Sequence, residues 1–160
     1  MTKVFIPNSS FYAKPANQQD IPRIKAIIFS VLEDYGLLPD DPSLDYDLDD
    51  IELHYKNGYF GLICNAEDLI VGTFALYRMN AELAEIRKMY LLPETRRQGL
   101  GTWMIDFLIH QARALGFKRL ELDTASVLVE AMKLYEKVGF QAMPAKKEGF
   151  RCNRAYFLKI

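Results

Sequence analysis

The sequence predicts a single mixed α/β domain, with a central, mostly antiparallel sheet of about six to seven strands and about four flanking helices. A length of 160 residues suits one domain with its own core. Between Tyr59 and Leu92, three strand-like apolar runs follow one another through short turns, as antiparallel strands do. A helical run then separates Glu82 to Leu92 from the next strand, Lys118 to Thr124, so these two strands must be parallel. No repeat or linker divides the chain.

The first third of the chain is expected to form one strand and two helices. Phe11 to Pro15 is a short strand. A helix follows, because apolar residues recur at helical spacing between the candidate N-cap Asp20 and the C-cap Gly36. The stretch from Leu37 to Asp50 is rich in Asp and Pro and is expected to be irregular, with a short helix from Asp49 to about Lys56.

The rest of the chain alternates strands with two helices. The expected strands are Tyr59 to Cys64, Leu69 to Met79, Glu82 to Leu92, Lys118 to Thr124, Phe140 to Ala145 and Arg154 to Ile160. The expected helices are Leu100 to Leu115, with Trp103, Phe107, Leu108 and Ala112 facing inward, and Val127 to Val138. Gly72 indicates a bulge or a close contact within its strand. Ala145 to Asn153 connects the last two strands.

Composition excludes several classes of function. The net charge of −1 provides no field for nucleic acid or an anionic membrane. The first eight residues do not resemble a signal peptide, and no apolar run is long enough to span a membrane. Cys64 and Cys152 lie far apart and share no motif, which predicts a reduced, cytoplasmic protein. His54 and His110 stand alone, so no metal site is expected.

The segment from Leu91 to Gly101 carries the strongest functional signal. Pro93 ends the strand, and two glycines allow a ligand to approach the backbone. The first amides of the next helix have no partner within that helix, and its dipole makes this end positive. Arg96 and Arg97 add two full charges. A strand, a basic glycine turn and a helix N-terminus together predict a phosphate site.

Neither the nucleotide P-loop nor the dinucleotide fingerprint is present. The pattern Arg96-x-x-Gly99-x-Gly101 resembles the pyrophosphate signature of the GNAT superfamily of acyl-CoA-dependent N-acetyltransferases. Downstream, Ala131 to Phe140 reads AMKLYEKVGF and resembles the family's A..LYEK.GF segment. The region from Ala84 to Phe140, about a third of the chain, carries both motifs.

The resemblance implies a GNAT-like sheet splayed at the parallel fourth and fifth strand pair, and acetyl-CoA as co-substrate. The strand backbone before the loop would pair with the pantetheine arm as an extra strand, the loop amides would hold the pyrophosphate, and the Met89 amide would polarise the thioester carbonyl. The implied cofactor-binding residues are Met89, Tyr90, Leu91, Arg96, Arg97, Gln98, Gly99, Leu100, Gly101 and Thr102. The alternative is that the loop is only a tight strand–helix connection.

Glu85 is the candidate general base. Its spacing from the arginine that opens the loop is similar to that of the base glutamate in the histone-acetylating branch of the family. A carboxylate on an apolar wall would have a raised pKa suited to this role. The alternative is a salt bridge to Arg87 or Lys88, or simple exposure. Asp123 and Thr124 are the reserve candidates for a base or a water-holding group.

Tyr135 occupies the family's tyrosine position, from which the phenol can protonate the CoA thiolate. An aromatic residue at helical spacing is usually part of the core, but Leu134 and Val138 could fill the core while Tyr135 turns to the cleft. One residue departs from the family pattern: Leu128 stands where many relatives have an asparagine that contacts pantetheine. We expect weaker cofactor binding from this change.

The acceptor side is less defined. The segment from Asp34 to Glu52 is acidic, with no basic residue, and is either a solvated loop or a lip that attracts a cationic amine. The tyrosines that could line such a lip are Tyr35, Tyr46, Tyr55 and Tyr59. Arg151 and Arg154 could instead bind a substrate carboxylate.

The sequence therefore predicts acetyl transfer from acetyl-CoA to a primary amine, on a small molecule or a peptide, by direct attack in a ternary complex. The alternative is a non-catalytic acyl-CoA-binding or sensing module on the same fold. No nucleic-acid or membrane partner is expected, and a homodimer is left open.

Overall fold

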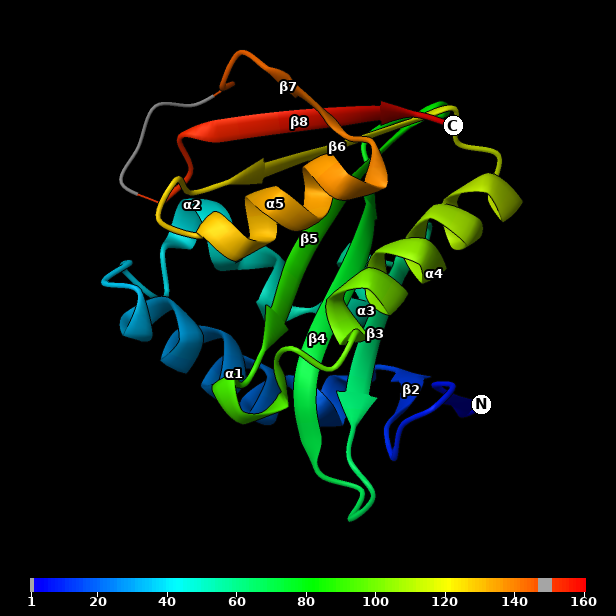
Figure 1. Ribbon diagram of the computed structural model, residues 1–160, viewed down its shortest axis with the longest axis vertical. Coiled ribbons are helices and arrows are strands. Elements are labelled where there is room, and N and C mark those ends of the chain that lie inside the picture. The colour runs from blue at the N-terminus through cyan, green and yellow to red at the C-terminus, as the bar shows by residue number, and fades with distance from the viewer. Residues whose placement is uncertain (1, 147–150) are drawn as a thin grey trace.

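A computed structural model describes residues 2–146 and 151–160 and contains one mixed sheet of eight strands (Figure 1). The strands are β1 (Val4–Phe5), β2 (Tyr12–Pro15), β3 (Tyr59–Cys64), β4 (Ile70–Arg78), β5 (Leu83–Leu91), β6 (Arg119–Thr124), β7 (Gln141–Met143) and β8 (Arg154–Lys159). Their order across the sheet is β1-β2-β3-β4-β5-β6-β8-β7. Only β5 and β6 run parallel; the other neighbouring pairs are antiparallel.

Helices cover both faces of the sheet (Figure 1). The helices are α1 (Ile21–Asp34), α2 (Pro42–Asp45), α3 (Ile51–His54), α4 (Leu100–Ala114) and α5 (Val129–Val138), with 3-10 turns η1 (Gln18–Asp20), η2 (Tyr46–Asp49) and η3 (Pro93–Thr95). One core lies between the sheet and α4 with α5, and the other between the sheet and α1 with the η2–α3 segment. No helix in the described part of the chain is long and apolar enough to cross a membrane.

The expected elements after Tyr59 are present, with ends that shift by a few residues. In α4, Leu108 and Ala112 are fully buried, whereas Trp103 and Phe107 are only partly buried and stack on each other over the core. The middle of the expected 145–153 connection, residues 147–150, lies outside the described residues.

The N-terminal third differs from expectation in three ways. The two-residue strand β1 was not expected, because it has too few residues to show a pattern. The carboxylate of Asp20 does not cap α1; it accepts the amide of Asn17 at 3.0 Å within a capping box of η1. The 37–50 stretch is not irregular throughout: α2 and η2 form there, and Asp41 caps α2 by accepting the Ser43 amide at 2.8 Å.

A bulge interrupts β5 where it pairs with β4. Thr73 pairs with Tyr90 and Ala75 pairs with Arg87, so two residues of β5, Lys88 and Met89, lie opposite a single residue of β4. Lys88 has a φ of 54°, in the left-handed region that a lysine rarely adopts. The hydroxyl of Thr73 donates a 2.6 Å hydrogen bond to the Lys88 carbonyl and so fixes the bulge from the side of β4.

Beside the bulge, the two parallel strands part. Pairing between β5 and β6 covers only Leu83 to Glu85 against Arg119 to Glu121, although β5 continues to Leu91. The expected splay between the parallel strands, and with it the expected fold class, is confirmed. Gly72 also makes the expected close contact, because a β-carbon there would lie 2.6 Å from Leu91 Cδ2.

Candidate functional site

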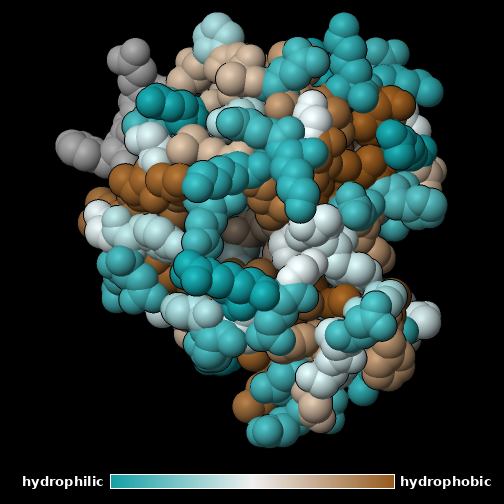
Figure 2. Space-filling model, viewed as in Figure 1, coloured by the Kyte–Doolittle hydropathy of each residue, from teal (hydrophilic) through white to brown (hydrophobic). Residues whose placement is uncertain are grey.

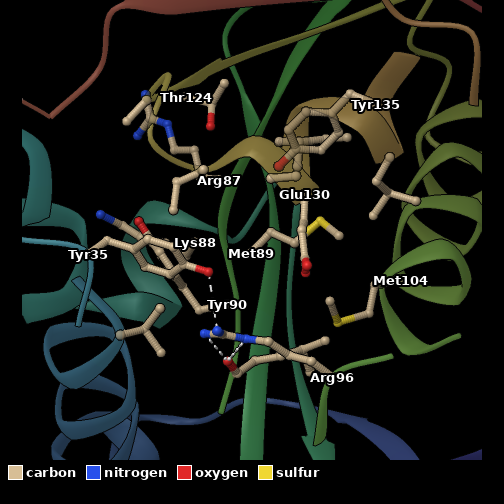
Figure 3. Close-up of a pocket in the computed structure, with 18 of the residues that line it drawn as sticks. Tyr35, Arg87, Lys88, Met89, Tyr90, Arg96, Met104, Thr124, Glu130 and Tyr135 are labelled. Carbon is tan, nitrogen blue, oxygen red and sulfur yellow. Dashed lines mark hydrogen bonds between the residues drawn. The ribbon is translucent and has the colours of Figure 1, made fainter. Parts of the chain in front are cut away.

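A cavity of about 330 Å³ opens where β5 and β6 part (Figure 3). The end of α1, the bulged half of β5 and the first turns of α4 and α5 line it. On the face shown in Figure 2, the surface is hollowed near its centre and hydrophilic side chains border the hollow. The residues expected to bind the cofactor that do line this cavity are Met89, Tyr90, Leu91, Arg96, Arg97, Gly99, Leu100, Gly101 and Thr102. Gln98 is exposed and is not among the lining residues.

The loop between β5 and α4 presents free amides to the cavity. Arg97 and Gly99 have φ values of 62° and 79°, and this left-handed geometry turns the chain into the helix. Along the chain from Arg97, the first backbone amide with a backbone partner is that of Trp103, which donates to the Gly99 carbonyl at 3.1 Å. Within the described residues, no acceptor is recorded for the amides from Arg97 to Thr102. Amides at a helix N-terminus that lack partners favour an anionic ligand such as a phosphate.

The two arginines of the loop have different surroundings. Arg96 donates to the Leu91 carbonyl at 3.1 and 2.9 Å and to the Tyr35 hydroxyl at 3.2 Å (Figure 3). It therefore ties the loop to β5 and to the end of α1. Arg97 is exposed and lies 3.2 Å from Glu130 of α5, across the mouth of the cavity. Because both groups of that pair are exposed, Arg97 is available to a charged ligand at little cost.

A buried ion-pair network lies behind the bulge. Lys88, with a side chain only 5% exposed, donates to Asp45 at 2.7 Å and to the Leu44 carbonyl at 2.8 Å. Arg151 donates to both carboxylate oxygens of Asp45, at 2.6 and 2.7 Å. Lys88 also lies 3.4 Å from Asp47. These contacts join α2, the bulge of β5 and Arg151, which precedes β8, so they fix the wall of the cavity.

Most acids of the segment from Asp34 to Glu52 have partners within the protein. Asp45 and Asp47 are buried and paired, Asp41 and Asp50 cap short helices, and Asp49 pairs with Lys25 at 2.8 Å. These five acids are engaged in contacts within the protein, whereas Asp34 and Asp40 are exposed. Of the two arginines considered for a substrate carboxylate, Arg151 is buried against Asp45, and Arg154 is exposed on β8.

Glu85 does not line the first cavity; it lines a second one of about 220 Å³. Its carboxylate is 2.6 Å from the Arg87 guanidinium, so the salt bridge that was the alternative interpretation is present. The Glu85 carboxylate is therefore ion-paired and does not lie on the expected apolar wall. Asp123 lines both cavities, and Thr124 lines the first.

Tyr135 is the most buried residue of α5, with 6% of its surface exposed, and its ring packs on Phe140 and Tyr156. The expectation that Leu134 and Val138 fill the core in its place is wrong, since both are only partly buried. Tyr135 belongs to the core and also lines the cavity, into which its hydroxyl points (Figure 3). Burial raises the pKa of Tyr135 well above its usual range, so the phenol keeps its proton at neutral pH.

Leu128 is the N-cap residue of α5 and makes no side-chain cap. It lines the first cavity and packs against the second core. The departure from the family pattern therefore places an apolar side chain on the cavity wall.

Sequence reasoning missed the roles of three residues that line the cavities, Lys88, Lys146 and Cys152, and of the carboxylates that pair with the two lysines, Asp45 and Glu121. Their partners lie far apart in the chain, so no local pattern marks them. Cys152 lines both cavities, but burial raises the pKa of its thiol and disfavours a nucleophilic thiolate.

Comparison with known proteins agrees with this geometry. The model of the acetyltransferase (GNAT) family matches residues 26–140. The chain is 33% identical over 132 residues to the uncharacterized N-acetyltransferase YjgM of Escherichia coli, covering 77% of each. The fold matches that of a GNAT-family acetyltransferase from Staphylococcus aureus with a TM-score of 0.86, at 22% identity and over 93% and 98% of the two chains. It also matches yncA of Salmonella typhimurium, solved with acetyl-CoA, with a TM-score of 0.73, at 16% identity and over 94% of each chain.

Proposed function

Because this chain belongs to the acetyltransferase (GNAT) family, we propose that it transfers the acetyl group of acetyl-CoA to a primary amine of a small molecule or peptide. The observation that carries the proposal is the opening between β5 and β6, which leads from the free amides of the loop into the cavity. Such an opening exposes the backbone of β5 to an extended ligand and places an anion site at its end.

In this proposal, the cofactor lies along the bulged half of β5. The backbone from Met89 to Leu91 pairs with the pantetheine arm, and the amides from Arg97 to Thr102, with the exposed Arg97 side chain, hold the pyrophosphate. The Met89 amide, displaced from the β4 ladder by the bulge, is the donor to the thioester carbonyl. The relative from Salmonella typhimurium that was solved with acetyl-CoA has the same fold, which supports this assignment.

The acceptor reaches the thioester from the second cavity. An alkyl ammonium has a pKa of about 10.4, so it must lose a proton before it attacks. Glu85 is our candidate for that base, acting through water or after rearrangement of its ion pair with Arg87, with Asp123 and Thr124 in reserve. Holding both reactants in adjoining cavities replaces a bimolecular encounter, which is the larger part of the rate gain.

Tyr135 is the candidate acid for the departing CoA thiolate. Its phenol points into the first cavity and carries a proton at neutral pH, although burial raises its pKa and so makes it a weaker acid than an exposed tyrosine. A thiolate with a pKa of about 8.5 is a tolerable leaving group unaided, so we expect a contribution of about 10²–10⁴-fold.

The cofactor site is tested with a matched pair of glycine variants. Gly99 and Gly116 lie at the two ends of α4, have φ values of 79° and 89°, and leave a β-carbon with no neighbour within 4 Å. Gly99→Val and Gly116→Val therefore carry similar backbone strain, and both should melt earlier than the wild type. Acetyl-CoA should raise the melting temperature of the wild type and of Gly116→Val, because it binds the folded state. Gly99→Val should lose that rise, because its side chain blocks the approach of the pyrophosphate.

If millimolar acetyl-CoA stabilises none of these proteins, the proposed cofactor is wrong. Activity is then measured as acetyl-CoA-dependent thiol release over polyamines, amino acids, aminoglycosides and lysine peptides. Stabilisation by acetyl-CoA, with no release of CoA thiol in the presence of any of these amines, would favour the non-catalytic acyl-CoA-binding module.

A further inference from the structure

A lysine of this chain already lies in the second cavity. Lys146 lines it, and its ammonium forms an ion pair with Glu121 and lies 3.8 Å from Glu85. Its side chain is 37% exposed, so it is partly withdrawn from solvent although it sits in a connecting segment.

The two carboxylates mark a defined place in the fold. Glu85 and Glu121 face each other as the last recorded pair of the parallel β5–β6 ladder, immediately before the strands part. The two cavities adjoin just beyond this pair, since both are lined by Ile86 and Arg87 of β5 and by Asp123 of β6. A primary amine beside a candidate base, next to the cavity assigned to acetyl-CoA, is in the position of an acetyl acceptor.

We propose that Lys146 is a self-acetylation site, at which the protein transfers an acetyl group from bound acetyl-CoA to its own lysine. This inference rests on the proposed function. The ammonium first loses a proton to Glu121 or Glu85, and from there to solvent. The Nζ lone pair then forms a bond to the acetyl carbon, the carbon–sulfur bond breaks, the nitrogen loses its second proton, and the departing thiolate takes up one proton. The net products are acetyl-lysine, CoA thiol and one proton.

The charges around Lys146 determine how the reaction depends on pH. Burial disfavours the ammonium, but the hydrogen bond to Glu121 and the charges of Glu85 and Asp123 outweigh burial and raise the pKa of Lys146. Arg119 and Arg87 face the same carboxylates, at 2.8 Å from Glu121 and 2.6 Å from Glu85. Self-acetylation should therefore accelerate as pH rises through the neutral and alkaline range, because the neutral amine becomes more abundant.

Acetylation would also change the cavity. It removes the lysine charge, and among the described residues Arg87 and Arg119 stay paired with the two carboxylates. A cationic acceptor would then no longer compete with Lys146 for the two carboxylates.

The test is incubation of the full chain with acetyl-CoA, followed by intact mass and peptide mapping, with each acetyl group adding about 42 Da. Lys133 is the internal control, since it is exposed on α5 and reacts first if labelling is only chemical. We expect Lys146 to be labelled about tenfold faster than Lys133, at a rate independent of protein concentration, as for a positioned intramolecular reaction. Desulfo-CoA, which occupies the site without an acetyl group, should slow labelling of Lys146 and leave Lys133 unchanged.

Lys146→Arg keeps the positive charge and the ion pairs but cannot be acetylated, so it should remove the fast-labelled peptide alone. Labelling of Lys133 ahead of Lys146, or labelling that desulfo-CoA does not slow, would overturn the inference. Release of CoA thiol from acetyl-CoA in the presence of an external amine, measured in the same preparation, separates failure of this inference from failure of the proposed function. If it occurs while Lys146 stays unlabelled, only this inference fails; if neither thiol release nor an acetyl-CoA melting shift is seen, the proposed function fails with it.

Discussion

Replacing Lys88 by Met should destabilise the protein far more than removing an exposed lysine. Met retains most of the stem volume of Lys88 but removes the ammonium that pairs with Asp45 and Asp47, which are 4% and 0% exposed. Removing one partner of a buried ion pair costs about 3–5 kcal/mol, because a buried charge is left without compensation. Asp45 keeps its two hydrogen bonds from Arg151, so we expect the lower end, about 3 kcal/mol.

For a chain of this size, each kcal/mol lowers the melting temperature by about 2–4 °C, which gives a decrease of about 6–12 °C. The matched control is Lys25→Met. It breaks the pair with Asp49, in which the side chains are 32% and 72% exposed, and should cost less than about 1 kcal/mol. Both variants are measured by thermal and urea unfolding. If Lys88→Met and Lys25→Met have the same melting temperature, the buried network adds no net stability. The ion pairs of Lys88 would then not stabilise the cavity wall.

Three further predictions follow from the site and its charges. Tyr135→Phe should lower turnover by about 10²–10⁴-fold and preserve the acetyl-CoA melting shift; loss of both would make Tyr135 a cofactor contact. Glu85→Gln should slow turnover most at neutral pH and recover partly at higher pH, whereas an unchanged pH–rate profile would assign the base to Asp123 or to bulk water. Burial alone would raise the pKa of Asp45, but Arg151 and Lys88 hold it below its ordinary value. Its stabilising effect is therefore present above the unfolded pKa of about 3.9 and is lost as pH falls through the lower folded pKa, so acid unfolding at constant temperature should be shallower in Asp45→Asn.

The sequence could predict those parts of the fold and site whose residues lie close together in the chain. The loop from Arg96 to Gly101 follows from a proline, two glycines and a helix start, all within a few residues, and it lies where expected. Helical spacing placed α4 and α5 but could not tell which face of α5 holds Tyr135, because the core and the cavity share that face.

The role of the acidic segment from Asp34 to Glu52 could not be predicted from its own residues. Its composition is equally consistent with a solvated loop and with a ligand-binding lip. The deciding fact is that Lys88 and Arg151, from two distant strands, meet Asp45 in the interior. Such long-range pairing leaves no pattern in the spacing of residues, and the same holds for Lys146 and the two glutamates.

The contact between Asp45 and Arg151 has a consequence for synthesis of the protein. The two residues are 106 positions apart. While the chain is still emerging from the ribosome, Asp45 and Lys88 can meet long before Arg151 is free to join them. The wall behind the bulge therefore stays incomplete until Arg151 has been synthesised. A nascent chain that already contains β1 to β6 therefore still lacks the Arg151 side of the cavity wall.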